Sequence, residues 1–234
     1  KTVALWGKLA ERYHDKHCIA GYDLINEVNW NLNPNELKNL YVQITNEIRK
    51  HDTDHILFIE GNWFANDFTG LTPPWDDNMV YSFHKYWNVN TTNTIQWVLD
   101  MRNQYNVPLW MGESGENSNM WFKEAISLFE SNNIGWAWWP WKRISTTVSA
   151  FSIPSNAKYD AVMRYWKGEG SRPSVDDAYE GMMTLTQSAL VDNAIYRKGV
   201  IDAMLRQPSD DSLVPYTNST IPGYIHATHY DMGA

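Results

Sequence analysis

Two glutamates each close a short apolar run, and their neighbours suit acid–base and nucleophilic chemistry. Glu27 ends the segment Gly-Tyr-Asp-Leu-Ile-Asn-Glu, with Asn26 beside it, and Glu113 lies between glycines in Met-Gly-Glu-Ser-Gly. Hydrolysis of a glycosidic bond needs one carboxyl group to protonate the leaving oxygen and a second to attack the anomeric carbon or to activate water. The amide of Asn26 could donate a hydrogen bond to a sugar hydroxyl, and the glycines let backbone and ligand approach closely. Two carboxyl groups flanking one glycosidic bond are the chemistry that these residues favour.

The elements that must position these residues are short apolar runs that recur along the chain. The five runs end in polar or glycine-rich residues and cover Cys18–Asn26, His55–Glu60, Met79–His84, Pro108–Glu113 and Ile134–Trp139. Four of them have few charges and no strict alternation, as strands buried on both faces do. Amphipathic stretches separate most of the runs, and strands that alternate with helices predict a parallel sheet.

The helices between the runs can be placed from their apolar spacing and their start signals. Asn33-Pro34-Asn35-Glu36 has the pattern of an N-cap, a proline in the first turn and a capping-box glutamate. The remaining helices are expected over Thr2–Trp6, Thr92–Tyr105, Asn119–Glu130, Tyr159–Trp166 and Pro173–Leu205. The crossover Gly61–Asp77 shows no clear helix, because its Pro73-Pro74 pair favours a loop.

Polar residues gather at the carboxyl ends of successive runs, namely Asn26-Glu27, His84, Glu113 and Trp139. The active sites of (β/α)8 barrels are built from such strand ends, whereas the glycine-rich fingerprints of nucleotide-binding sheets are absent. Five strands are too few to close a barrel. We therefore predict an α/β fold, a (β/α)8 TIM barrel that is incomplete here, with about strands four to eight present and the N-terminal strands missing.

These motifs, in this order, resemble glycoside hydrolase family five, the cellulase family whose acid/base and nucleophile end barrel strands four and seven. Asp23-Leu24-Ile25-Asn26-Glu27 is similar to the family's Asp-Leu-x-Asn-Glu-Pro, with Val28 in place of the proline. His84-Lys85-Tyr86 is similar to the His-x-Tyr of strand six, and Gly112-Glu113-Ser114-Gly115 to the Gly-Glu-x-Gly of strand seven. Gly135-Trp136-Ala137-Trp138-Trp139 is similar to the Gly-Trp-x-x-Trp of strand eight.

The resemblance, which covers Trp6 to Arg206, implies roles for six residues. Glu27 would be the acid/base and Glu113 the nucleophile. The four residues expected to bind substrate or to position the carboxylates are Asn26, His84, Tyr86 and Trp139. Among these, Tyr86 would donate its hydroxyl to the nucleophile, and Trp139 would stack on a sugar ring. The family's arginine and histidine of strands two and three would lie upstream of this sequence.

Other polar and aromatic residues at strand ends carry weaker expectations. Glu60 also closes an apolar run, but no family motif matches it, so we expect it to be structural. Trp63, Trp87 and Trp141 each follow a strand end, where lining a cleft and packing in a loop or core are equally plausible. No spacing of His, Asp and Glu suggests a zinc site, and we expect neither a metal nor a cofactor.

The domain organisation follows from composition. Residues 1–206 are expected to be the C-terminal part of the barrel domain, and residues 207–220, rich in Pro, Ser, Asp and Asn, a linker. Residues 221–234 contain Ile-Pro-Gly-Tyr-Ile-His-Ala and then Tyr-Asp-Met-Gly, which resembles the opening strand of a family-six carbohydrate-binding module. That module would be truncated in this chain.

Composition limits the partners. The net charge of −8, without a Lys/Arg cluster, disfavours nucleic acid and acidic membrane surfaces, and no apolar run is long enough for a membrane helix. A hydrophobic content of 43% supports a substantial core. Cys18 is the only cysteine, so no intrachain disulfide can form. We expect a monomeric, extracellular protein whose signal peptide would lie upstream of Lys1.

The function that these features favour is a retaining endo-β-1,4-glucanase acting on β-glucan, with its two carboxyl groups about 5–5.5 Å apart. A β-mannanase, a xyloglucanase or a β-1,3-glucanase of the same family would share the machinery. Rivals of another kind are a non-catalytic polysaccharide-binding barrel and a barrel enzyme whose glutamates are coincidental. Because five strands leave open sheet edges, we expect these 234 residues alone neither to fold stably nor to hydrolyse a substrate.

Overall fold

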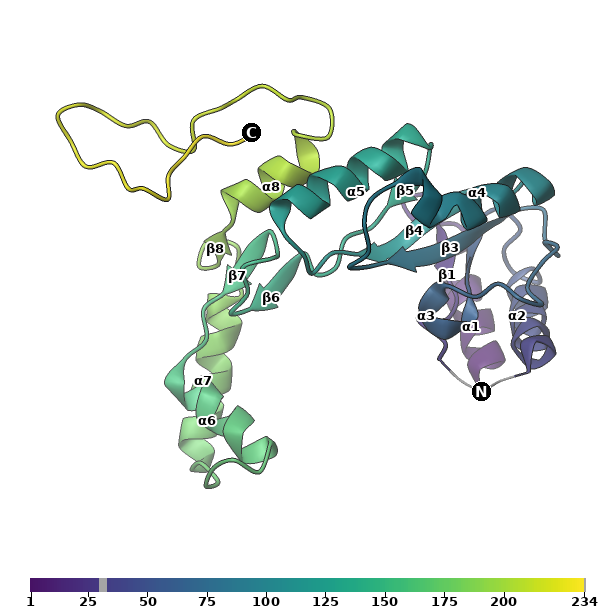
Figure 1. Cartoon of the computed structure of the whole chain (residues 1–234). Helices are drawn as coiled ribbons and strands as arrows, with labels where there is room; N and C mark the ends of the chain where they lie inside the picture. Colours follow the sequence, from purple (N-terminus) through teal and green to yellow (C-terminus); the bar gives the residue numbers. More distant parts are fainter. Residues whose placement is uncertain (30–32, 234) are drawn as a thin grey trace. The chain divides into compact units, whose positions relative to one another are not determined.

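The computed structural model describes residues 1–29 and 33–233, which form two compact units (Figure 1). The first comprises Lys1–Ser114 with Leu128–Ala137, and the second Gly115–Ser127 with Trp138–Ala234. The first unit holds a five-stranded parallel sheet whose strands lie in chain order: β1 (Gly21–Asp23), β2 (Ile56–Glu60), β3 (Met79–Lys85), β4 (Leu109–Ser114) and β5 (Gly135–Trp136). This curled half-barrel of parallel strands joined by helices confirms the predicted fold class.

Helices precede and connect these strands, and all except α3 lie where the sequence predicts a helix. They are α1 (Thr2–Tyr13), α2 (Pro34–Ile48), α3 (Asn62–Ala65), α4 (Thr92–Tyr105) and α5 (Asn119–Ser131). The predicted capping box opens α2, where the Asn33 side chain accepts the Asn35 N–H at 3.0 Å and the Glu36 carboxylate accepts the Asn33 N–H at 3.3 Å. None of the helices within the described residues is long and apolar enough to cross a bilayer.

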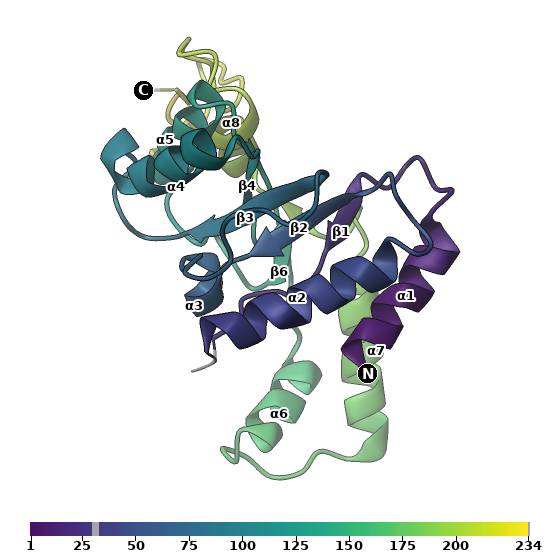
Figure 2. The same ribbon diagram turned by 90° about the vertical axis from the view of Figure 1, so that its right-hand side faces the viewer.

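The core of the first unit forms where helices pack on the sheet. Figure 2 shows α1 and α2 side by side along one face of β1 and β2. Trp6 of α1 lies 5.9 Å from Tyr22 of β1, measured between ring centroids, and the Tyr22 hydroxyl donates to Asp52 at 2.6 Å. All seven residues of β3 are buried, which agrees with a strand covered on both faces. The rigid strands β1 to β4 are therefore the frame from which the site residues project.

The crossover after β2 differs from expectation because it contains a short irregular helix. In α3, Trp63, Phe64 and Ala65 have φ values of 53°, 55° and 61°, which lie in the left-handed region. Such values are uncommon for residues that carry a Cβ. Sequence periodicity could not reveal this turn, since it spans only four residues.

The second unit contains one predicted helix that is divided in two, and short strands that the sequence pattern does not predict. The stretch predicted as helical from Pro173 to Leu205 contains two helices, α7 (Val175–Ser188) and α8 (Lys198–Leu205), separated by β8 (Ile195–Tyr196). Strand β8 pairs with β7 (Phe151–Ile153), which pairs with β6 (Lys142–Ile144). Strands of two or three residues are too short for their apolar alternation to be read from the sequence.

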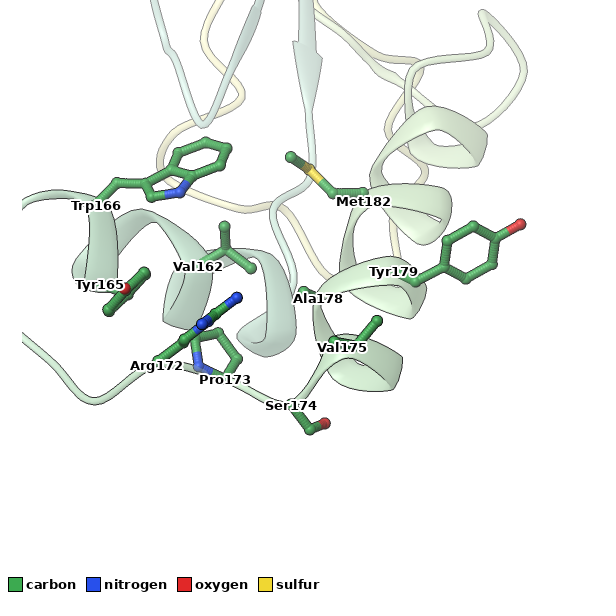
Figure 3. A pocket seen from close by; sticks show the side chains of 10 residues that line it. All are labelled: Val162, Tyr165, Trp166, Arg172, Pro173, Ser174, Val175, Ala178, Tyr179 and Met182. Carbon is green, nitrogen blue, oxygen red and sulfur yellow. The ribbon is translucent and has the colours of Figure 1, made fainter.

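The second unit also contains a groove between two helices. An apolar groove of about 410 Å³ lies between α6 (Ala157–Trp166) and α7, lined by side chains from both helices and from the segment before α7 (Figure 3). The one charged side chain that lines the groove is Arg172, so the groove offers no carboxyl pair for catalysis.

Within residues 221–233 the structure has no strand and one isolated bridge, from Met232 to Val214. A carbohydrate-binding module at this end stays a prediction.

Candidate active site

Glu27 lies on a strained turn just after β1. Its φ of 44° is in the left-handed region, which residues with a side chain adopt only when their surroundings hold them there. The backbone N–H of Glu27 donates to Oε2 of Glu60 at 2.6 Å. Val28, which replaces the family's proline, is buried, and its carbonyl accepts the N–H of Phe64 at 3.2 Å. Contacts from the end of β2 and from α3 thus fix the turn that carries the predicted acid/base.

His84 connects the turn of Glu27 to the interior of the sheet. It is buried near the end of β3, with Nδ1 2.8 Å from Oε1 of Glu27 and Nε2 3.3 Å from Oε1 of Glu60. Burial alone would lower the pKa of His84, but the hydrogen bond and charge of Glu60, followed by the hydrogen bond to Glu27 and the charge of Glu113, raise this pKa above its usual value. Both nitrogens of one ring therefore face carboxylates.

Glu113 reaches the level of His84 through a β-bulge. The pairing of β3 with β4 shifts between Phe83 and His84, so that Phe83 pairs with Met111 and His84 pairs with Glu113. Gly112 is the extra residue of the bulge. A Cβ at Gly112 would lie 2.2 Å from Oγ of Ser82 and 3.2 Å from Nε2 of His84. The glycine before the predicted nucleophile is therefore required by close packing.

The two predicted catalytic carboxylates lie close together and each has its own hydrogen-bond donor. The hydroxyl of Tyr86 donates to Oε1 of Glu113 at 2.6 Å, a short contact typical of a charge-assisted bond. Glu27, His84 and Glu113 each offer one ligand atom, and these three atoms lie within 4.8 Å of one another. Both carboxylates can therefore reach the same small group of substrate atoms.

The same three side chains could in principle coordinate a metal ion, because each offers one oxygen or nitrogen atom. However, Nδ1 of His84 is already hydrogen-bonded to Glu27, and Glu113 already accepts from Tyr86. These hydrogen bonds account for the arrangement of the three side chains, and we assign no metal site to them.

A second carboxyl pair, Asp23 and Glu60, lies behind this site and was not recognised as functional from the sequence. Desolvation by neighbouring protein atoms, and then the negative charge of Glu60, raise the pKa of Asp23 to about 7, even though part of Asp23 is reached by solvent. A hydrogen bond between the two carboxyl groups adds to this shift, while the charge of His84 opposes it. At pH 7 about half of the molecules therefore carry a proton on Asp23, which it can donate to Glu60. The available sequence signal was that both residues are acidic and lie on otherwise apolar strands.

The remaining predicted site residues are less tightly held. Asn26 is exposed on the turn beside Glu27. Trp139 belongs to the second unit, where 52% of it is exposed and its backbone bridges Gly115. The first unit thus brings Glu27, His84, Tyr86 and Glu113 together, with Asn26 adjacent in sequence.

The three tryptophans left open by the sequence are not core residues. Trp63, Trp87 and Trp141 are all exposed. Within the first unit, Trp63 lines a hollow of about 290 Å³ beside the end of β3, together with Asn66 and the Tyr86 segment. Within the second unit, Trp141 and Trp139 line a larger hollow. Their exposure excludes core packing and leaves open whether they line a cleft or pack within a loop.

Comparison with known proteins adds the family context. The sequence model of "Cellulase (glycosyl hydrolase family 5)" matches residues 1–145. Over 90 residues, which are 37% of this chain and 18% of the relative, the chain is 37% identical to a β-xylosidase of Phanerodontia chrysosporium.

Among solved structures, the chain is similar to Cel5A of Thermotoga maritima in complex with mannotriose, with a TM-score of 0.62 and 14% identity over 87% of this chain and 65% of that one. It is also similar to a hyperthermophilic endo-β-1,4-glucanase, with a TM-score of 0.56 and 21% identity over 81% of this chain and 64% of that one. At these identities the likeness supports the barrel fold. The chain spans less than two thirds of the length of either solved chain.

Proposed function

Because the chain belongs to the cellulase family, glycosyl hydrolase family 5, we propose that it forms part of a retaining endo-β-1,4-glucanase acting on β-glucan. The observation that carries this proposal is the proximity of Glu27 and Glu113, which follow different strands and whose nearest ligand atoms lie within 4.8 Å. Inverting enzymes separate their two carboxyl groups by about 6.5–9.5 Å to admit water, whereas retaining enzymes need about 5–5.5 Å. The activity is proposed for a polypeptide in which the barrel is closed.

In the first half of the reaction, the carboxylate of Glu113 attacks the anomeric carbon and forms a glycosyl ester. The bond from that carbon to the leaving oxygen breaks, and Glu27 gives its proton to this oxygen. Tyr86 holds the attacking carboxylate through its 2.6 Å hydrogen bond. His84 holds the carboxyl group of Glu27 through Nδ1.

In the second half, the carboxylate of Glu27 takes a proton from water while the water oxygen attacks the anomeric carbon. The ester bond breaks, Glu113 leaves as a carboxylate, and the sugar has the configuration with which it began. His84 can hold Glu27 in both halves because Nδ1–H donates to Oε1 whether Glu27 is a carboxylate or carries its proton on Oε2. Asn26 and Trp139 are proposed as contacts to the sugar.

The substrate class rests on the family and on the proteins that the chain resembles. A β-mannanase, a xyloglucanase and a β-1,3-glucanase would use the same two glutamates, and the similar proteins include a mannotriose complex and a β-xylosidase. Rates on soluble β-1,4-glucan, β-mannan, xyloglucan, β-1,3-glucan and an aryl xyloside separate these possibilities. A rate on β-1,4-glucan below that on another polymer would reassign the substrate without changing the mechanism.

The catalytic proposal is tested in the native polypeptide that carries these residues. Proton NMR of the earliest products should show a retained anomeric configuration, and Glu113→Gln should abolish turnover. Glu124→Gln makes the same change on the exposed face of α5 and should leave the rate unchanged. If the protein is instead a non-catalytic polysaccharide-binding barrel, the wild type and both variants should bind the polymer and none should hydrolyse it. Hydrolysis that survives Glu113→Gln would refute the assignment of the nucleophile.

Three further proposals concern the molecule as a whole. We propose an extracellular location, a monomeric state, and a carbohydrate-binding module of family six that begins at residues 221–234. The sequence pattern Ile-Pro-Gly-Tyr-Ile-His-Ala supports the last of these. An extracellular protein should be found in the culture medium, and a monomer should sediment with the mass of one chain. If the module is present, removal of everything after residue 206 should lower the affinity of the native protein for insoluble polysaccharide.

A further inference from the structure

Glu60 lies between the two strands that carry the acid/base machinery. It is the last residue of β2, which pairs with β1 on one side and β3 on the other. It is only 1% exposed. Its Oε2 accepts the backbone N–H of Glu27 at 2.6 Å, and its Oε1 lies 3.3 Å from Nε2 of His84. A carboxylate buried this deeply requires donors around it, and these donors belong to the acid/base Glu27 and to His84, which holds it.

The contact with Glu27 acts on the backbone. The left-handed turn at Glu27 is one that residues with a side chain rarely adopt, so something must hold it. A 2.6 Å bond from an amide to a carboxylate is short and charge-assisted. Because the direction of the Glu27 side chain follows from its backbone angles, Glu60 sets where the acid/base points.

The contact with His84 acts on the protonation of the ring. Carboxylates face both nitrogens, with Glu27 2.8 Å from Nδ1 and Glu60 3.3 Å from Nε2, and they raise the pKa of His84. In the protonated ring, Nε2–H donates to Glu60 and Nδ1–H donates to Oε1 of Glu27. When Glu27 is the acid, its own proton is then left on Oε2 for the leaving oxygen.

We propose that Glu60 is a positioning residue for the acid/base, holding the backbone of Glu27 with one oxygen and the Nε2 proton of His84 with the other. The inference rests on the proposed function, since it concerns the same reaction. Asp23 supports Glu60 from the neighbouring strand through a hydrogen bond. The hydroxyl of Tyr41 donates to the backbone carbonyl of Glu60 at 2.9 Å, a contact that does not involve the carboxylate.

Glu60→Gln is the decisive change, because it keeps the shape but replaces one accepting oxygen with an NH2 group. That group must face either the N–H of Glu27 or Nε2 of His84, and both positions call for an acceptor. In the native polypeptide we expect kcat to fall about 10- to 100-fold, the size of effect that a small misplacement of a catalytic group produces. KM should change by less than about twofold, because Glu60 would not touch the substrate.

A second measurement does not depend on turnover. Two-bond proton–nitrogen spectra of histidine-labelled protein report the tautomer and the titration of His84, whose signals are identified by their loss in His84→Asn. The charged groups that face His84 are Glu27, Glu60, Glu113 and Asp23. Removing the charge of Glu60 should lower the pKa of His84, because that charge favours the protonated ring.

Tyr41→Phe is the matched control, since it removes a hydrogen bond to Glu60 but leaves the carboxylate in place. It should lower the melting temperature and leave kcat and the titration of His84 as in the wild type. If Glu60→Gln does not fold, Glu60→Asp keeps the charge, withdraws the carboxylate by one methylene and should show the same fall in kcat.

The possible outcomes separate this inference from the proposed function. Wild-type kcat in a folded Glu60 variant, or an unchanged titration of His84 in Glu60→Gln, overturns the positioning role while the catalytic roles of Glu27 and Glu113 stand. Activity that survives Glu113→Gln overturns the proposed reaction instead, and the His84 spectra still decide whether Glu60 holds the ring.

Discussion

Replacing Tyr86 by phenylalanine tests how the nucleophile is held. The change removes one hydroxyl, which donates to Oε1 of Glu113 at 2.6 Å. A hydrogen bond to a charged group contributes about 1.5–3 kcal/mol, and each 1.4 kcal/mol corresponds to a factor of ten. If the whole contribution is lost on the way to the transition state, kcat/KM falls roughly 10- to 150-fold. The fall should appear in kcat, because this hydroxyl orients the enzyme's own carboxylate.

The assay is the initial rate on soluble β-1,4-glucan, together with the rate at which a fluorinated glucoside labels Glu113. Both rates should fall by the same factor, since both report formation of the glycosyl ester. Tyr22→Phe is the matched control: it also removes a hydroxyl that donates to a carboxylate at 2.6 Å, here that of Asp52 in the segment between α2 and β2. That variant should unfold more easily yet keep its kcat. A folded Tyr86→Phe enzyme within threefold of the wild-type rate would refute the orienting role of Tyr86.

Two further predictions follow from the site. Asp23→Asn should flatten the dependence of stability on pH. The folded pKa of Asp23, about 7, exceeds the unfolded value of about 3.9, so the folded wild type binds more protons and loses stability as pH rises between these values. Urea unfolding at pH 4.5 and 7.5 measures this slope, and equal slopes in the two proteins would contradict it. Gly112→Ala should destabilise the protein by about 1–3 kcal/mol through overpacking and lower kcat, because its Cβ would lie 2.2 Å from Oγ of Ser82. Gly170→Ala, where the nearest atom lies at 3.4 Å, should do neither, as thermal melts and rates will show.

The sequence predicts the half-barrel well because its strands and helices have strong local signals. The run Met79–His84 is mainly apolar, and it lies within a strand whose every residue is buried. The helix predicted over Thr92–Tyr105 has those bounds in the structure. By contrast, β6 and β8 have three and two residues, and so short a segment gains its shape from the strand beside it rather than from its own pattern.

The site residues that can be predicted are those whose own segment carries a recognisable motif. His84 and Tyr86 could be inferred together because they lie two residues apart at a strand end. The partnership of Glu60 with Glu27 could not, because it joins a side chain to a backbone N–H that sequence patterns do not describe. A glutamate at the end of an apolar run is usually solvated, and nothing in its own segment distinguishes one that is 1% exposed.

The position of Glu113 depends on an irregularity of the sheet rather than on its regular pairing. Met111 pairs with Phe83, so unbroken pairing would set Gly112 beside His84 and Glu113 beside Lys85. Side chains alternate between the faces of a strand, and a slip of one residue exchanges the faces. Without the bulge, Glu113 would therefore share a face with Lys85, opposite the face of His84 and Glu27. Because the extra residue must fit against Ser82 and His84, it has to be the one that lacks a Cβ. The glycine that precedes the nucleophile is thus part of the catalytic geometry, since it places Glu113 on the same face as the acid/base.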